Sequence, residues 1–222
     1  METTLHQQLK HSYAPDDSQT EVTLGAYRID AVRDDELIEI QCASLSAIRD
    51  KCQTLLKRHR LRVVKPVVMR TRIAKIKRAG GKVTSRRMSP KRGNVLDVFE
   101  ELIYFTRVFP HGNLTIEIPL VHVEQVRSPK RGRRRRSWHK DYRVEDTRLE
   151  SIESTIEIRV PEDLLELIGL PKESAPFNTA DLAAWTDLPR WKTQQIAYVL
   201  RKTGAVEVAT RNRHGIVYRR VA

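Results

Sequence analysis

The sequence has little cysteine, few aromatic residues and no long apolar run, and these shortages exclude several classes of protein. Two cysteines in 222 residues, Cys42 and Cys52, are too few for a disulfide framework or a cysteine-based zinc site. We expect both to be buried, reduced thiols. Acidic residues interrupt the most apolar segment, residues 95–105, so no stretch is suited to span a bilayer.

The amino-terminal residues 1–6 are polar, and they lack the apolar segment of a secretory signal. We therefore expect a cytoplasmic protein with no membrane association. A chain of 222 residues is long enough for one large domain or for two modest ones, each with a core of its own.

Positive charge is what the chain has in excess. Lysine and arginine number 41 against 28 acidic residues, which gives a net charge of +13. Such an excess favours a polyanionic partner, and nucleic acid, DNA in particular, is the first candidate. An anionic membrane is less favoured because neither end of the chain forms a basic amphipathic helix. The alternative is a soluble basic protein whose charge serves no polyanionic partner. The sequence leaves the oligomeric state open, and a homodimer is one possibility.

The first 68 residues predict a compact α/β layer in the order helix, strand, strand, strand, helix, strand. The expected segments are helices at 5–11 and 46–59 and strands at 20–24, 27–32, 37–42 and 62–69. Beyond residue 70 we expect the same sheet to be extended to about residue 160. The extension is predicted to contain a basic hairpin at 73–83, a helix at 95–107, a strand at 113–126 broken at Pro119, and a strand at 151–160.

The second and third expected strands form a hairpin that brings two carboxylates together. If Asp34 and Asp35 centre its turn, Asp30 lies directly opposite Glu39, and Arg28 opposite Gln41. Like charges in that position destabilise a strand pair, so a divalent cation is the obvious reason for them. The opposite, apolar face would carry Tyr27, Ile29, Ala31, Ile38, Ile40 and Cys42.

These residues supply the oxygen ligands that magnesium or manganese prefers. Asp30, Glu39 and the backbone carbonyl of Ile40 would bind the metal, and Glu21 would add a ligand or hold a water bound to it. Gln41 would orient the attacking water or a phosphate oxygen. The alternative is that both acids are solvated on an open face of the sheet, with Arg28 paired diagonally to Glu39.

The segments containing Glu21, Asp30 and residues 38–41 resemble the core of the PD-(D/E)xK nuclease superfamily. They are most similar to its competence CoiA-like branch, in which glutamine replaces the usual lysine. The resemblance covers residues 5–68 and implies a restriction endonuclease-like mixed sheet flanked by helices. It also implies a catalytic set of the initial acid, two magnesium-binding acids and the lysine position, namely Glu21, Asp30, Glu39 and Gln41.

The last part of the chain, residues 172–222, resembles a winged helix-turn-helix domain, on residues 181–183, 200–204 and 206–218. The resemblance implies that the second helix enters the major groove and that the wing contacts the backbone or the minor groove. The implied helix contacts are Arg190, Lys192, Thr193, Gln194 and Gln195, and the wing contacts are Arg211, Arg213 and His214. A protein-interaction module is the alternative. We expect a buried core of Trp185, Trp191, Ile196, Val199 and Leu200.

A basic stretch at residues 127–143 contains nine lysines and arginines and one acid. It includes Arg133, Arg134, Arg135 and Arg136, with Trp138 and Tyr142 placed among the cations. Cations and aromatic rings in alternation favour phosphate contacts and stacking on bases. A loop that only aids solubility is the alternative. The histidines His6, His111, His122 and His139 lack ligand spacing and are read as structural or solvated.

Together these features predict a nuclease-like domain at residues 1–160 and a winged helix at 172–222. The expected function is hydrolysis of phosphodiester bonds in DNA by a Mg²⁺- or Mn²⁺-dependent endonuclease that the winged helix positions. A non-catalytic nucleic-acid-binding regulator that retains an inactive nuclease fold is the alternative, because neutral Gln41 stands at the lysine position. RNA as substrate is a third reading.

Overall fold

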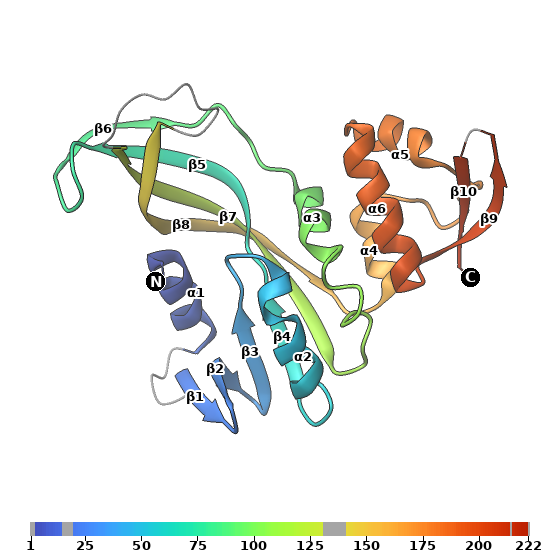
Figure 1. Ribbon diagram of the computed structural model, residues 1–222, viewed down its shortest axis with the longest axis horizontal. Coiled ribbons are helices and arrows are strands. Elements are labelled where there is room, and N and C mark those ends of the chain that lie inside the picture. The colour runs from blue at the N-terminus through green and yellow to red at the C-terminus, as the bar shows by residue number, and fades with distance from the viewer. Residues whose placement is uncertain (1–2, 15–19, 131–140, 214, 222) are drawn as a thin grey trace.

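A computed structural model describes residues 3–14, 20–130, 141–213 and 215–221. The protein is a mixed α/β molecule with one large mixed sheet flanked by helices (Figure 1). A group of helices with a small two-stranded sheet lies beside it at the carboxyl-terminal end of the chain. Within the described ranges, no helix is long and apolar enough to cross a membrane.

The elements follow the expected order through the first 64 residues. The helices are α1 (Thr4–Tyr13), η2 (Leu45–Ile48), α2 (Arg49–Leu55), η3 (Val95–Val98), α3 (Phe99–Leu102), α4 (Pro161–Leu167), α5 (Thr179–Thr186) and α6 (Arg190–Thr203). The strands are β1 (Thr20–Leu24), β2 (Tyr27–Arg33), β3 (Glu36–Ile40), β4 (Arg60–Val64), β5 (Val67–Ile76), β6 (Val83–Met88), β7 (Leu114–Pro129), β8 (Tyr142–Ile158), β9 (Val206–Asn212) and β10 (Gly215–Arg220).

The large sheet has the strand order β1-β2-β3-β4-β7-β5-β6, and β8 also pairs with β7. Strands β1, β2 and β3 are antiparallel neighbours, whereas β3, β4, β7 and β5 run parallel to one another. Strands β5 to β8 form a curved arm on this sheet (Figure 1). The expectation that the chain beyond residue 70 extends the sheet is therefore confirmed.

The β2–β3 hairpin has the predicted register. Asp34 and Asp35 form its turn with φ angles of 49° and 61°, as a tight type I′ hairpin turn requires. The pairs Ala31–Ile38, Val32–Leu37 and Arg33–Glu36 then follow the predicted pairing.

Two of the expected strands differ because of proline. The single strand expected at 62–69 is divided into β4 and β5, since Lys65 and Pro66 fall between them. Conversely, β7 continues through Pro119, where a break was expected. Pro119 lies between Glu117, where the pairing with β4 ends, and Leu120, where the pairing with β5 begins. Its missing N–H therefore removes no bond from the ladders with β4 and β5, and on the other side of β7 Pro119 lies opposite Thr155 of β8.

Both faces of the sheet are buried around β3, all five of whose residues are buried. Ala31, Ile38 and Ile40 pack with Leu5 and Leu9 of α1 on one side. On the other side, Leu37 belongs to a larger cluster that also contains Cys52 and Leu55 of α2. Helices on both faces are typical of parallel strands, and they leave little of β3 exposed to solvent.

The carboxyl-terminal part shares that larger cluster. Leu164 and Leu165 of α4, Leu182 of α5 and Ile196 of α6 belong to it together with residues of the sheet. Phe177 forms a bridge to Tyr218 of β10, which adds a third short segment to the β9–β10 pair. The helices therefore pack on the sheet through a continuous apolar core.

The two tryptophans expected in that core are outside it. Trp185 is 54% exposed and Trp191 is 53% exposed, so the prediction was wrong for both, whereas Ile196, Val199 and Leu200 are buried as predicted. Helix α6 is amphipathic, but the position of Trp191 falls on its open side.

Candidate functional site

Asp30 lies where the β2–β3 ladder ends. The last pair in that ladder is Ala31–Ile38, so Asp30 and Glu39 occupy the next position in the predicted register. The Oδ2 atom of Asp30 accepts a hydrogen bond from the backbone N–H of Ile40 at 2.8 Å. The Asp30 carboxylate, the first candidate metal ligand, thus satisfies the backbone N–H of Ile40 where the ladder ends.

Helix α1 covers the Asp30 carboxylate. His6 Nε2 lies 3.3 Å from Asp30 Oδ2. Burial alone would raise the pKa of Asp30, but the hydrogen bonds from His6 and Ile40 and the charges of His6 and Lys10 outweigh it and hold that pKa below its ordinary value. Asp30 is therefore an ionised carboxylate at neutral pH.

Glu39 lies under α2 instead. Its residue exposure is 4%, and its Oε1 lies 2.6 Å from Lys51 Nζ. Apart from this ion pair, the buried Oε1 atom has no hydrogen-bond partner. Burial raises the pKa of Glu39 to about 7, against the opposing effect of Lys51 and with a further rise from the charge of Asp30.

Two helices therefore contribute cations to the two carboxylates from opposite faces of the sheet. Ile29 packs in the cluster of α2, whereas Ala31 packs in the cluster of α1, so the alternation of β2 is interrupted at Asp30. The expectation that six apolar residues share one face is wrong for Tyr27 and Ile29, which pack in the cluster of α2. Glu21 of β1 lies opposite Asp30, between the pairs Thr20–Ala31 and Val22–Ile29. Its positive φ of 54° shows that β1 is irregular at the same point as β2.

Glu21 is tied to two cations. Its carboxylate forms ion pairs with Lys10 of α1 and with Arg28 of β2. Arg28 is thus paired to Glu21, and it does not form the diagonal pair with Glu39 of the alternative reading. Lys51 also donates to the backbone carbonyl of Arg28, so α2 is fixed to the edge of this hairpin.

Gln41 directly follows β3 and is half-buried. Its backbone N–H donates to Val64 O at 2.9 Å, and its side-chain Oε1 accepts from Ala43 N at 3.2 Å. The amide brings no positive charge to the site. The cations beside Glu39 and the following loop are lysines from other elements.

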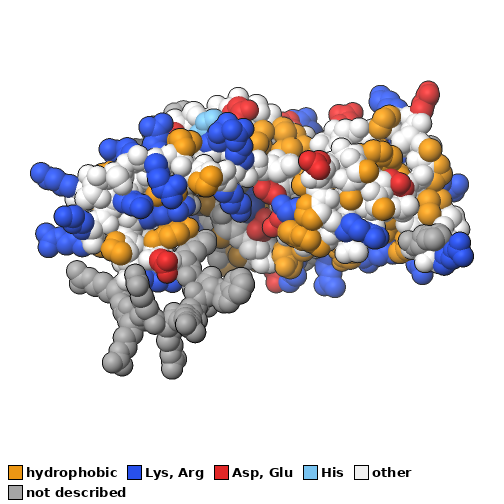
Figure 2. All heavy atoms as spheres, turned by 90° about the horizontal axis from the view of Figure 1, so that it is seen from above, with side chains coloured by type: hydrophobic (Ala, Val, Ile, Leu, Met, Phe, Trp, Pro, Cys, Tyr) orange, Lys and Arg blue, Asp and Glu red, His pale blue; other side chains and the backbone are white. Residues whose placement is uncertain are grey.

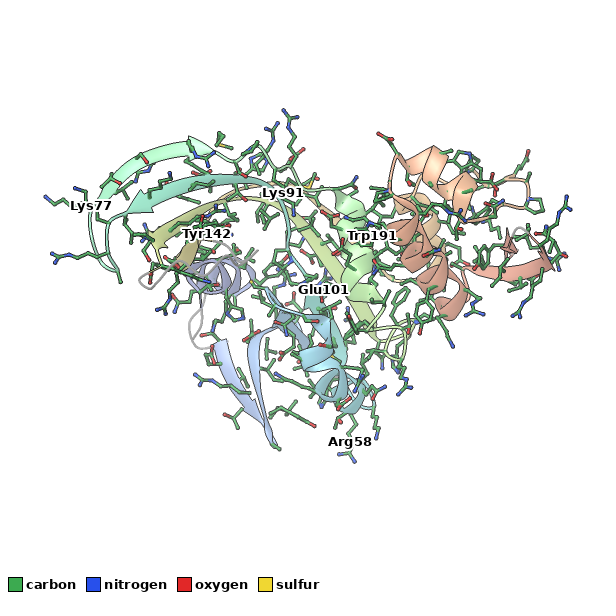
Figure 3. The ribbon with its side chains drawn as sticks, turned by 45° about the horizontal axis from the view of Figure 1, so that its top comes forward. Arg58, Lys77, Lys91, Glu101, Tyr142 and Trp191 are labelled. Carbon is green, nitrogen blue, oxygen red and sulfur yellow. The ribbon has the colours of Figure 1, made fainter. Side chains whose placement is uncertain are left out.

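A second buried lysine supports the loop after Gln41. Lys65 is 6% exposed, donates to the carbonyl of Ala43, and lies 3.8 Å from Glu101 Oε1. Glu101, labelled in Figure 3, also accepts from Leu45 N at 2.9 Å. Burial lowers the pKa of Lys65 although the charge of Glu101 opposes this. The pair holds residues 43–45 against β4 and α3.

The sequence predicts a magnesium ion at this hairpin. Within the part of the chain that the structure describes, no group of three or more His, Cys, Asp and Glu residues is arranged to hold a metal. Magnesium, however, is usually bound by one or two carboxylates and keeps several waters. Asp30 and Glu39 are two carboxylates of one hairpin, but His6 of α1 faces the first and Lys51 of α2 faces the second, from opposite sides of the sheet. The buried Glu39 Oε1 already has the Lys51 ammonium at 2.6 Å, so a metal ion would share Glu39 with this lysine.

Helix α6 presents only some of its predicted DNA contacts. Thr193 is fully buried, and its hydroxyl donates to Thr179 O and Arg190 O, both at 3.0 Å. Lys192 forms ion pairs with Asp97 and, at 2.8 Å, with Glu100. Neither side chain reaches out to a ligand in this arrangement.

The remaining predicted contacts lie at the surface or outside the described ranges. Arg190, Gln194, Arg211 and Arg213 are exposed, while Gln195 is half-buried and its Oε1 has no partner. In the basic stretch, the Arg127 guanidinium lies 4.1 Å from the centre of the Tyr142 ring. The residues Arg133, Arg134, Arg135, Arg136, Trp138, His139 and His214 lie outside the described residues.

Sequence reasoning missed Lys51 and His6. Both lie on helices, and each reaches a hairpin residue only because its helix packs against one particular face of the sheet. The position of Lys51 next to buried Cys52 weakly indicated that this lysine lies near the sheet, since a residue beside a buried helix position lies at the edge of the helix–sheet interface. No local pattern distinguishes His6 from other histidines.

Comparison with known proteins gives relatives but no activity. A family model described as "Domain of unknown function (DUF8091)" matches residues 3–159. An "Uncharacterized protein" of Treponema pallidum (strain Nichols) is 31% identical over 183 residues, which are 82% of this chain and 71% of that protein. No solved structure matches the chain.

Proposed function

The chain belongs to the DUF8091 family, a domain of unknown function, and from its site chemistry we propose that it is a metal-dependent nuclease that hydrolyses phosphodiester bonds in DNA. One observation carries the proposal. Glu39, a buried carboxylate, lies next to Asp30 in the hairpin register and 2.6 Å from the ammonium of Lys51. A buried acid paired with a half-buried lysine, beside a second half-buried acid, is costly for folding and useful for phosphodiester chemistry.

Asp30, Glu39 and the carbonyl of Ile40 would hold Mg²⁺ or Mn²⁺. When bound, the ion would supply Lewis-acid polarisation of the phosphodiester and lower the pKa of the attacking water. Asp30 is suited to this role because its carboxylate is ionised at neutral pH. His6 and the Ile40 N–H fix its orientation from the side of α1.

Lys51 would supply the positive charge that Gln41 lacks. Its ammonium group lies beside Glu39 and is held there by the carbonyl of Arg28. An oriented cation of this kind stabilises negative charge that develops on a phosphate during cleavage. The neutral residue at position 41 is then no obstacle to catalysis, and the Gln41 amide orients water or a phosphate oxygen.

The arrangement of elements supports a restriction endonuclease-like assignment. The order α1, β1, β2, β3, α2, β4 is that of the resemblance, and the strands lie adjacent in one mixed sheet with helices on both faces. Residues 161–221 likewise have the helices and the β9–β10 hairpin that a winged helix would need. In this proposal the exposed Arg190, Gln194, Arg211 and Arg213 contact DNA.

A second candidate is a non-catalytic, DNA-binding regulator. It is favoured by one contact, because the Gln41 side chain is used by its own loop through Ala43 N. In that case Lys51 would serve only to neutralise buried Glu39.

A cleavage survey separates the two candidates. Purified protein is incubated with duplex, single-stranded and branched DNA, and with RNA, in Mg²⁺, in Mn²⁺ and in chelator. We expect metal-dependent cleavage of DNA that is lost in Asp30→Ala and Glu39→Ala and retained in Glu162→Ala, an exposed control on α4. Binding without metal-dependent cleavage of any substrate would overturn the nuclease and leave the regulator.

A separate variant tests the winged helix. Arg190→Ala with Gln194→Ala should weaken duplex binding by about tenfold or more, since base-edge contacts contribute about 1–3 kcal/mol each. Unchanged affinity would argue that this part of the chain binds a protein.

A further inference from the structure

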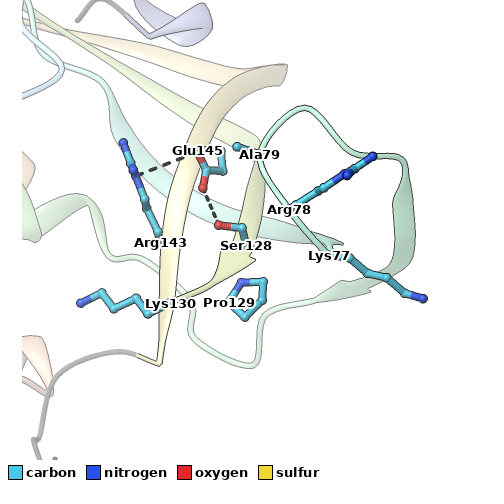
Figure 4. Close-up of a pocket in the computed structure, with 8 residues that line it drawn as sticks. All are labelled: Lys77, Arg78, Ala79, Ser128, Pro129, Lys130, Arg143 and Glu145. Carbon is cyan, nitrogen blue, oxygen red and sulfur yellow. Dashed lines mark hydrogen bonds and ion pairs between the residues drawn. The ribbon is translucent and has the colours of Figure 1, made fainter. Parts of the chain in front are cut away.

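A pocket of about 520 Å³ lies at the far end of the β5–β8 arm, away from the β2–β3 hairpin (Figures 1 and 4). The turn after β5 forms one wall, and the adjoining ends of β7 and β8 form the other. Four cations line it, Lys77, Arg78, Lys130 and Arg143, with one acid, Glu145. None of these five residues belongs to the candidate metal site.

The single acid of the pocket is already engaged. Ser128 donates its hydroxyl to Glu145, and Arg143 Nε lies 3.9 Å from the same carboxylate (Figure 4). Four positive charges against one negative charge leave the pocket strongly electropositive. The acid is thus held by Ser128 of β7 and lies beside Arg143 of its own strand β8.

The positive charge continues along the arm. Residues 70–88 contain eight lysines and arginines and no acid. Two of the eight pair with acids of neighbouring strands, Arg72 with Glu150 at 2.8 Å and Arg86 with Glu124 at 2.9 Å. Figure 2 shows blue side chains gathered over this end of the molecule. A polyanion seated at the pocket would therefore meet further cations along β5 and β6.

Arg143 lies on β8, Lys130 directly follows β7, and Lys77 and Arg78 lie in the turn after β5, so the paired strands bring the four cations to one end of the arm. Strand β5 pairs with β7 as far as Lys75 and Arg127, and β7 pairs with β8 as far as Pro129 and Tyr142. The Arg127 guanidinium stacks on the Tyr142 ring at 4.1 Å from its centre. The described residues that line the pocket include no aromatic side chain, so the pocket offers charge contacts in preference to stacking on unpaired bases.

We propose that this pocket is a phosphate-binding cleft that holds the backbone of duplex DNA along the β5–β6 arm. The proposal rests on the proposed function for its ligand class. Duplex DNA matches the site because it carries one negative charge per about 1.7 Å of its axis, so that several closely placed cations are neutralised at once. The cleft binds DNA at a distance from the carboxylates of Asp30 and Glu39 and orients the DNA relative to them.

The test uses the full chain and a charge-matched control. Lys77 and Arg78 are exposed, so Lys77→Ala with Arg78→Ala removes two charges from the pocket with no loss of core. Lys57→Ala with Arg58→Ala removes two exposed charges elsewhere, since Arg58 and Lys77 lie well apart (Figure 3). Binding of a duplex of about 20 base pairs, roughly two helical turns of DNA, is followed by fluorescence anisotropy in chelator at several salt concentrations.

We expect the pocket variant to lose about tenfold or more in affinity and the slope of log K against log salt to fall by about 1 to 2, because each lost phosphate contact removes about 0.9. The control should keep the wild-type slope. Equal affinity and slope for the pocket variant, or equal losses in both variants, would overturn the cleft. Loss of binding to phosphatidylserine vesicles with duplex binding unchanged would assign the pocket to a membrane instead.

This result is distinct from that of the cleavage survey. If the protein cleaves no DNA but its duplex binding depends on Lys77 and Arg78, the nuclease proposal is overturned and the phosphate-binding cleft stands. If cleavage depends on Asp30 and Glu39 but duplex binding does not depend on Lys77 and Arg78, the cleft is overturned and the nuclease proposal stands. Charge reversal, Lys77→Glu with Arg78→Glu, should weaken binding more than the alanine pair if the contacts are electrostatic.

Discussion

Glu39 combines two properties that a structural residue rarely has. Its carboxylate is buried, and one oxygen has only the Lys51 ammonium as a partner. Burying a charge costs free energy unless it is paired, which explains why its pKa rises to about 7. A buried carboxylate that destabilises the fold in this way is more readily explained by a role in binding or catalysis than by a structural role.

Lys51→Met tests the role of the ammonium. We expect the rate of DNA cleavage under single-turnover conditions to fall by about 100-fold or more, as when one oriented electrostatic contact is removed from an active site. Binding of Ca²⁺ or Mn²⁺ should persist, because the carboxylates remain. Lys57→Met, an exposed lysine beyond the end of the same helix, should leave the rate unchanged. Equal rates for wild type and Lys51→Met would show that this lysine only balances the charge of Glu39.

The two cysteines should differ in reactivity. Burial, with a further contribution from the charge of Glu39, raises the pKa of Cys52 to about 12. Its thiol is therefore neutral throughout the range of pH 7 to 9. We expect iodoacetamide to modify Cys52 in the folded protein far more slowly than in the unfolded protein at any pH in this range. Mass spectrometry of peptides after timed labelling measures this directly, and equal folded and unfolded rates would contradict the burial.

At the scale of elements, β3 and β4 are held by a buried ionic network at the end opposite Gln41. Arg62 donates to Glu36 at 2.8 Å and to Glu157 at 2.6 Å, and it also bonds Glu117. Tyr13 of α1 donates its hydroxyl to Glu117. Arg62, Glu36 and Glu117 are each less than a tenth exposed. One arginine thus joins three strands and, through Glu117, the covering helix.

Arg62→Met should destabilise the fold by about 3–5 kcal/mol, because it leaves buried carboxylates without their cation. The same change combined with Glu36→Gln and Glu117→Gln should recover part of the loss. Urea unfolding followed by circular dichroism measures both. A single variant as stable as the wild type would mean that water reaches the network.

The sequence allows the hairpin to be predicted at this scale and leaves its surroundings undetermined. Asp34 and Asp35 tolerate positive φ and are local turn residues, so the register followed from the turn. The proximity of Lys51 to Glu39 depends on how a helix packs across the sheet, which periodicity does not specify. The continuity of β7 at Pro119 depended on two neighbouring strands that meet there, and no local pattern describes that.

At the scale of the whole molecule, helix α4 joins the sheet to the carboxyl-terminal helices. It contacts both β8 and α6, and its Leu164 and Leu165 are fully buried in the shared cluster. Lys192 adds ion pairs from α6 to Asp97 and Glu100. DNA held by the last helices would therefore have a fixed orientation relative to the sheet.

This packing predicts cooperative unfolding. Calorimetry of the full chain should give one transition, and Leu165→Ala should destabilise that single transition by about 2–5 kcal/mol, as for other buried leucines. Two transitions in the wild type, of which Leu165→Ala shifts only one, would show that the parts fold independently.

We propose that the carboxylates of Asp30 and Glu39 hold a divalent cation, and this can be measured without any nucleic acid. Titration of Mn²⁺ followed by electron paramagnetic resonance measures the free ion directly and needs no substrate. We predict a site in the wild-type protein that Mg²⁺ competes for, and its loss in Asp30→Asn and in Glu39→Gln, with Glu162→Gln binding as the wild type does. Equal Mn²⁺ binding by all four proteins would contradict the account.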